Sequence, residues 1–153
     1  ELNFPATPPM PSSAPEGLAE ALGVQPKFVG RSRFDYLVEI ASEGDVRDLR
    51  LDFGAIRRLP VRGVIVTSVA TTPGWDFVSR FFAPAAGVDE DPVTGSAHCC
   101  LTPFWSAKLG KTTLVARQVS ARGGTMRIGG HPFLAKPVDP DTVLEYIDKH
   151  ALP

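Results

Sequence analysis

Apolar positions along the first two thirds of the chain predict a series of strands. Residues 34–42 (FDYLVEIAS) alternate apolar and polar positions, which is the pattern of a strand with one buried face. The residues expected on that face are Phe34, Tyr36, Val38 and Ile40. The β-branched run at residues 62–71 (RGVIVTSVAT) predicts a strand that is buried on both faces. Further strands are expected at residues 27–32, 76–84, 111–120 and 124–130.

Helical spacing marks the remaining segments. Leu18, Ala21 and Leu22 recur at helical spacing ahead of Gly23, which predicts a short helix after Ser13. A second helical segment is expected at residues 45–59, and a loop at the proline-rich residues 7–15.

Residues 96–110 (SAHCCLTPFWSAKLG) have apolar side chains around nearly the whole helical circumference. We therefore expect a helix that protein encloses on most sides. The tail at residues 139–152 predicts an amphipathic helix, with Asp139 as its N-cap and Pro140 at its first position. Together the elements predict an α+β fold, a mostly antiparallel sheet curled around one central helix.

Composition and charge limit the expected partners and compartment. The 153 residues carry 16 Lys and Arg against 17 Asp and Glu, so neither a nucleic acid nor a membrane surface is an expected partner. No apolar run approaches the roughly 20 residues that span a bilayer. Adjacent cysteines form a strained disulfide, so Cys99 and Cys100 are expected to be reduced thiols in a cytoplasmic protein. Because the chain begins at Glu1, we expect a piece of a longer protein.

The stretch GVDEDPVTGSAHCC at residues 87–100 concentrates the candidate chemistry. A metal site is disfavoured there, because His98, Cys99 and Cys100 point to different sides of a helix. The sequence also holds no second His or Cys cluster to complete a tetrahedral site. The nucleotide-binding P-loop and the nucleophile elbow both fail nearby, on the spacing of their glycines.

The turn inside this stretch favours an anion site. Small residues precede a helix there, so unpaired backbone N–H groups face outward at the positive end of the helix dipole. These residues are Thr94, Gly95, Ser96 and Ala97. Such a site suits a substrate carboxylate as well as a phosphate, and Glu90 or Asp91 would supply an acid or base. The alternative is that Thr94 or Ser96 only caps the helix while the acids are solvated.

Two longer segments carry a family resemblance. They are SRFFAPAAGVDEDPVTGSAH at residues 79–98 and LGKTTLVARQVSARGG at residues 109–124, and they resemble the PhzF-like family of phenazine biosynthesis-like proteins. The matching positions are Arg80, Phe82, Ala83, Pro84, Gly87, Glu90, Asp91, Pro92, Thr94, Gly95, Ser96, Ala97, His98, Leu109, Gly110, Gln118, Ser120, Arg122, Gly123 and Gly124. The resemblance implies one half of a diaminopimelate epimerase-like fold, in which two similar domains enclose the active site between them.

The resemblance also implies how the chain is divided. Residues 1–128 correspond to the family's second domain with the crossover strands, and residues 129–153 form a tail with the amphipathic helix. The family's first domain, which carries a glutamate proton shuttle in a Gly-Asn-Pro loop, has no counterpart here. We therefore expect the fragment to be inactive alone, and we expect its exposed inter-domain surface to favour a homodimer.

The function implied by the resemblance is a cofactor-independent isomerase or epimerase, which transfers a proton on a small carboxylate-bearing substrate without a metal. Asp91 is the implied catalytic carboxylate. The implied substrate-binding residues are Thr94, Gly95, Ser96, Ala97 and His98. His98 is expected either near the cleft or as a satisfied core residue. The alternative function is a non-catalytic binding or structural module that retains the fold.

Two further pairs of residues need an assignment. The related epimerases use two cysteines as base and acid, but Cys99 and Cys100 are expected to be buried within the helix, with raised pKa values, and inert. Arg80 and Arg122 are expected either to pair with the acids or to flank strands in solvent.

Overall fold

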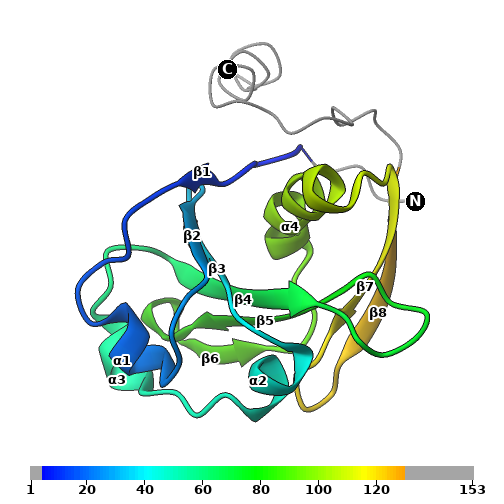
Figure 1. The fold of residues 1–153 in the computed structure, drawn as a ribbon. Helices are drawn as coiled ribbons and strands as arrows, with labels where there is room; N and C mark the ends of the chain where they lie inside the picture. Colours follow the sequence, from blue (N-terminus) through cyan, green and yellow to red (C-terminus); the bar gives the residue numbers. More distant parts are fainter. Residues whose placement is uncertain (1–4, 130–153) are drawn as a thin grey trace.

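A mixed sheet forms the centre of the computed structural model, which describes residues 5–129 (Figure 1). Its strands are β1 (Met10–Pro11), β2 (Phe28–Arg31), β3 (Asp35–Glu39), β4 (Gly63–Val69), β5 (Phe77–Ala83), β6 (Val88–Asp91), β7 (Thr113–Gln118) and β8 (Gly124–Gly129). The strand order is β1-β2-β3-β4-β5-β7-β8, and β6 pairs with β5 beside this path.

Strand pairing within the sheet is antiparallel except at two positions, β3 with β4 and β5 with β7. Parallel neighbours require a crossover connection, and each of these connections carries helices. Helices α2 (Glu43–Asp48) and α3 (Phe53–Arg57) lie between β3 and β4, and α4 (Gly95–Leu109) lies between β6 and β7. The predicted α+β class with a mostly antiparallel sheet is therefore confirmed.

The two faces of the sheet bury separate hydrophobic clusters. One face packs against α2, α3 and α1 (Leu18–Leu22), and the other packs against α4, around which the sheet curves (Figure 1). Strand β3 was expected to have one buried face but is buried on both, with Tyr36 and Val38 in the first cluster and Leu37 in the second. Phe34 was expected beside Tyr36 and Val38 but is 45% exposed, since the strand begins only at Asp35.

Helix α4 is enclosed on most sides, as its sequence predicts, and several of its polar groups find partners inside the protein, although His98 Nε2 and Ser106 Oγ have none among residues 5–129. Trp105 stacks on Phe77 with ring centroids 5.7 Å apart, and its indole N–H donates to Thr67 Oγ1 at 3.0 Å. Pro103 lacks the N–H that would bond to the Cys99 carbonyl one turn earlier. The backbone N–H of Thr7 donates to that carbonyl instead, at 3.0 Å.

Some predicted boundaries are wrong. The helical segment expected at residues 45–59 is two helices, because the side chains of Ser42 and Asp52 each cap a separate first turn. The loop expected at residues 7–15 contains β1, a short edge strand that tolerates its proline. The short first helix begins at Leu18, after Gly17 rather than near Ser13.

Three other expectations concern boundaries and membranes. Gly23 ends the first helix in the left-handed conformation, as expected. The predicted amphipathic helix at residues 139–152 lies outside the described residues. Within residues 5–129, no helix has the length and hydropathy that crossing a membrane requires.

One buried carboxylate fixes the crossover between β3 and β4. Glu43 is 3% exposed and accepts hydrogen bonds from the backbone N–H groups of Thr71 and Thr72, at 2.7 and 2.9 Å. Both threonine hydroxyls and the Arg47 guanidinium donate to the same carboxylate. Burial opposes ionisation, but these hydrogen bonds outweigh it and lower the pKa of Glu43 to about 2.

We expect Glu43→Gln to lower the free energy of unfolding by about 1–3 kcal/mol, because buried donors lose a charged acceptor. The folded-state pKa is about 2 against an ordinary 4.5, so the contribution is complete above pH 4.5 and is lost as the pH falls toward 2. Urea unfolding near neutral pH and near pH 3 measures this, with the exposed Glu20→Gln as the control. Equal stability of the two variants at both pH values would contradict the assignment.

Candidate functional site

The candidate site lies where β6 ends and α4 begins. Asp91 is the last residue of β6 and pairs with Phe81 of β5, and Thr94 is the N-cap residue of α4. The stretch from Pro84 to Thr94 leads from β5 into this site. It contains the 3₁₀ helix η1 (Pro84–Ala86) before β6, and pairing with β5 holds the acidic residues in an extended strand.

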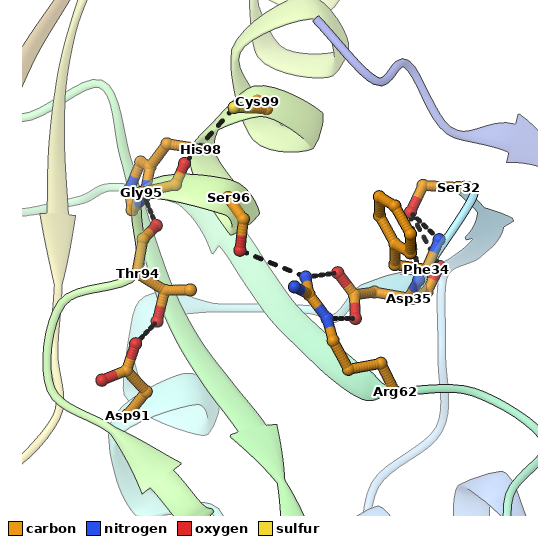
Figure 2. A network of polar contacts seen from close by, with 10 residues as sticks. All are labelled: Ser32, Phe34, Asp35, Arg62, Asp91, Thr94, Gly95, Ser96, His98 and Cys99. Carbon is orange, nitrogen blue, oxygen red and sulfur yellow. Dashed lines mark hydrogen bonds and ion pairs between the residues drawn. The ribbon is translucent and has the colours of Figure 1, made fainter. Parts of the chain in front are cut away.

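Asp91 and Thr94 are joined by a direct hydrogen bond. The Thr94 hydroxyl donates to Asp91 Oδ2 at 2.5 Å (Figure 2). The Thr94 side chain therefore makes no capping bond to the first turn of α4. One carboxylate oxygen of Asp91 is fixed in this way, and the side chain stays partly exposed.

Gly95 and Ser96 are exposed at the start of the helix. Their backbone N–H groups have no acceptor among residues 5–129, as is usual for the first turn of a helix. The Ser96 hydroxyl oxygen accepts a hydrogen bond from Arg62 Nη2 at 3.1 Å. Two free amides, a hydroxyl and a carboxylate thus lie along one short turn, which can accommodate a small anion.

A buried glutamine from β7 holds the turn in place. Gln118 is fully buried, and its side-chain oxygen accepts from the Thr94 backbone N–H at 2.8 Å. Its side-chain nitrogen donates to the Asp91 carbonyl at 2.6 Å and to Thr94 Oγ1 at 3.2 Å. The sequence analysis did not assign Gln118 to the site, although a polar residue inside a predicted strand was the available signal.

The next residues along the chain complete this support. The Ser120 hydroxyl donates to the Pro92 carbonyl at 2.8 Å. Gly124 packs so closely on the turn that an added Cβ would lie 2.5 Å from Val93 Cγ2. The Gln-x-Ser-x-Arg-Gly-Gly segment therefore fits against the turn and fixes its position.

An ion pair borders the site on the other side. Asp35 is 2% exposed, and its carboxylate accepts from Arg62 Nε at 3.0 Å and from Arg62 Nη2 at 2.5 Å. The hydrogen bond to Asp35 raises the pKa of the Arg62 guanidinium. Figure 2 shows this guanidinium between Asp35 and Ser96. Sequence reasoning missed both residues, because they lie in no motif.

Ala97 and His98 point into the protein. Ala97 is 1% exposed and His98 is 6% exposed, whereas the two residues before them are open to solvent. His98 Nδ1 lies 2.7 Å from the Thr94 carbonyl, and the ring lies 6.1 Å from the Phe77 ring. Burial lowers the pKa of His98, which favours a neutral ring that donates from Nδ1. His98 is therefore buried in the core, but it is not the satisfied core residue of the prediction, because its Nε2 has no hydrogen-bond partner among residues 5–129.

The two cysteines follow their predicted burial only in part. Both are free thiols, with Cys100 fully buried and Cys99 half-buried. Burial raises the pKa of the Cys100 thiol to about 12, and burial also raises the pKa of Cys99. A thiolate is the reactive form of cysteine, so neither thiol is poised for acid–base chemistry.

The remaining charged candidates are Arg80, Glu90 and Arg122. Arg80 binds Glu90 through two hydrogen bonds, at 2.7 and 2.9 Å, so the expected pairing of Arg80 with an acid is confirmed. The same contacts hold both oxygens of Glu90, which leaves Asp91 as the less constrained carboxylate of the turn. Arg122 is exposed and forms no ion pair with another described residue.

Comparisons with known proteins place these residues in a family context. The model of the PhzC-PhzF family, described as phenazine biosynthesis-like protein, matches residues 10–135. An uncharacterized isomerase of Halalkalibacterium halodurans is 50% identical over 84% of this chain and 49% of its own length. An uncharacterized isomerase of Pseudomonas aeruginosa is 54% identical over 82% of this chain and 47% of its own length.

A solved structure agrees with these sequence matches. The chain is similar to a phenazine biosynthesis PhzF family protein of Enterococcus faecalis, with 37% identity and a TM-score of 0.79 over 84% of this chain and 49% of that one. This match confirms the predicted diaminopimelate epimerase-like fold. The chain spans about half the length of the curated relatives that it matches.

We expect Gln118→Leu to lower the free energy of unfolding by about 2–4 kcal/mol, because two buried backbone groups lose their partner. These groups are the Thr94 N–H and the Asp91 carbonyl. Urea unfolding measures the change, and the exposed Gln25→Leu is the control, with an expected change within about 0.5 kcal/mol. A Gln118→Leu protein as stable as this control would show that the side chain does not hold the turn.

The two thiols are distinguished by single substitutions. In Cys99→Ser only the buried Cys100 remains, and we expect no reaction with a disulfide reagent until urea unfolds the protein. In Cys100→Ser the half-buried Cys99 remains, and we expect reaction that is slower than that of a free thiol. Rapid modification of Cys100 in the folded protein would disprove the inert assignment.

Proposed function

The chain belongs to the PhzC-PhzF family of phenazine biosynthesis-like proteins, and on that premise we propose that the turn at Asp91 is one half of an isomerase active site. The reaction proposed is a proton transfer on a small carboxylate-bearing substrate, without a metal or organic cofactor. The isomerase names of the two bacterial relatives support an isomerase-type activity. The observation that carries the proposal is the pair of exposed amides at Gly95 and Ser96 beside a partly free carboxylate.

In this proposal the start of α4 binds the acid group of the substrate. The free N–H groups of Gly95 and Ser96 donate to the substrate carboxylate at the positive end of the helix dipole. A carboxylate is favoured over a phosphate by the local charge. Asp35 and Arg62 neutralise each other, so Asp91 leaves the surroundings negative, which disfavours a dianion more than a monoanion.

Asp91 then acts as the acid or base on one face of the substrate. The hydrogen bond from Thr94 fixes Oδ2 and leaves Oδ1 as the oxygen that exchanges a proton with a substrate carbon. Gln118 holds the backbone on both sides of this residue, so the carboxylate keeps its orientation during the transfer. The bond that breaks is C–H at one carbon, and the same proton or a solvent proton is returned at another face or carbon.

The proposed site needs a second half. Since the chain covers about half of its relatives, we propose that residues 1–128 form the second domain of a longer protein and residues 129–153 a tail outside it. The opposite acid or base would then come from the other domain, across a cleft that the start of α4 faces. The segment Ala85 to Asp89, between β5 and the turn, is exposed on this chain. Phe34 and Val88 are each 45% exposed. We infer that such surfaces favour self-association of the isolated chain, in a cytoplasmic protein.

We expect Asp91→Asn in the full-length protein to reduce hydrogen exchange at the substrate carbon by about 10²–10⁴-fold, the usual contribution of a positioned acid or base. Deuterium incorporation from heavy water into a panel of small carboxylic acids, followed by mass spectrometry, measures the loss. Asp89→Asn, an exposed acid on the same strand, is the matched control and should keep normal exchange. Full exchange by Asp91→Asn would refute the catalytic assignment of Asp91, whereas no exchange by the unsubstituted protein would favour the binding-module alternative.

A further inference from the structure

A chain of three side chains reaches the proposed anion site from a distant part of the sheet. Asp35 lies at the start of β3, Arg62 immediately precedes β4, and Ser96 is the second residue of α4. Arg62 Nη2 donates to Asp35 Oδ2 at 2.5 Å and to Ser96 Oγ at 3.1 Å. One nitrogen therefore connects a buried carboxylate to the hydroxyl at the helix start (Figure 2).

The surroundings of Arg62 hold its side chain in this position. Its backbone N–H donates to the Phe34 carbonyl at 2.9 Å, beside the paired residues Asp35 and Gly63. Its guanidinium carbon lies 5.3 Å from the Phe34 ring centroid and 5.5 Å from that of Phe81, within the range of cation–π contacts. Two hydrogen bonds from a planar fork to one carboxylate give a fixed orientation that a lysine does not reproduce.

The direction of the Arg62 bond decides what Ser96 can do. A guanidinium only donates, so the Ser96 oxygen acts as an acceptor in this contact. Its own hydroxyl proton has no acceptor among the described side chains and backbone groups. An Arg62 side chain on one side of the oxygen leaves the proton free to point toward a ligand on the other side.

We propose that Arg62 is a positioning residue, which orients the Ser96 hydroxyl as a hydrogen-bond donor to a monoanionic carboxylate ligand while Asp35 anchors Arg62. This inference rests on the proposed function, because it assigns a role within the same anion site. Arg62 acts through Ser96 and does not itself contact the ligand. Its effect on affinity therefore exists only while Ser96 carries a hydroxyl.

A double-mutant cycle in the full-length protein tests this dependence. Sodium benzoate is the probe, and the backbone amide resonances of Gly95 and Ser96 report its binding at constant ionic strength. We expect Arg62→Gln and Ser96→Ala each to raise the dissociation constant about three- to tenfold, which corresponds to one lost hydrogen bond. The double variant Arg62→Gln/Ser96→Ala should bind no more weakly than Ser96→Ala, since the two residues act as one unit.

Three further variants separate positioning from charge and from folding. Arg57→Gln removes one positive charge from α3, on the opposite face of the sheet, and should leave benzoate affinity unchanged. Asp35→Asn/Arg62→Gln removes the buried charge together with its partner, so it should fold while showing the same loss of affinity as Arg62→Gln. Arg62→Lys should restore only part of the affinity, because lysine cannot keep the fork to Asp35 and reach Ser96 at once.

The outcomes distinguish this inference from the proposed function. If benzoate shifts the Gly95 and Ser96 amides but the Arg62 and Ser96 effects add, the site stands and the positioning role of Arg62 is overturned. An Arg57→Gln effect as large as that of Arg62→Gln would also overturn it, in favour of a general charge effect. If benzoate leaves both amides unshifted in the unsubstituted protein, the proposed anion site fails and this inference fails with it.

Discussion

Helix α4 must be buried along most of its length and still expose its first two residues. Burial favours pairing of the polar groups of the helix inside the protein, because an unpaired buried group costs about 1–3 kcal/mol. The Trp105 indole meets this requirement through Thr67, and the Cys99 carbonyl meets it through Thr7. Two buried atoms of the helix, His98 Nε2 and Ser106 Oγ, have no partner among residues 5–129. The amides at Gly95 and Ser96 differ from them in being exposed, so water or a ligand can satisfy them.

The sheet resolves this constraint by supporting the turn rather than covering it. Gln118, at the end of β7, forms hydrogen bonds with the backbone of Asp91 and Thr94. Arg62, just before β4, donates a hydrogen bond to Ser96. Neither residue seals the amides. The backbone of the turn is thus held in place while its first amides stay exposed, and a pre-organised binding site needs both properties. The strand β6 contributes as well, because pairing with β5 fixes the direction from which Asp91 enters the turn.

Local patterns in the sequence were sufficient for most of the elements, but not for β1, β6 or the break between α2 and α3. The β-branched run at residues 62–71 predicted a buried strand, and the apolar pattern at residues 96–110 predicted an enclosed helix. Both predictions are correct, because the burial of each element follows from the apolar residues within one short stretch of sequence. The sequence also indicated the Thr94 to Ser96 turn, since small residues before a helix leave its first N–H groups without intrahelical acceptors. The break between α2 and α3 was missed, although Asp52 carries a recognisable cap.

Contacts between residues far apart in the sequence could not be predicted from local patterns. Asp35 and Arg62 are 27 positions apart, and Arg62 and Ser96 are 34 positions apart. No periodicity connects such residues, and only the parallel pairing of β3 with β4 brings the first two together. Gln118 had a local signal, because a polar residue in a buried strand needs a partner. Which partner it finds depends on the crossover through α4.

The site therefore draws on four segments that the two crossovers bring together. The β3 start, the residue before β4, the α4 start and the β7 end must all be in place before the turn has its shape. A partly folded chain lacks this geometry, so it has no site at which the ligand can bind. Binding is then linked to complete folding, so saturating ligand would shift the folding equilibrium by mass action and report on the integrity of the whole sheet.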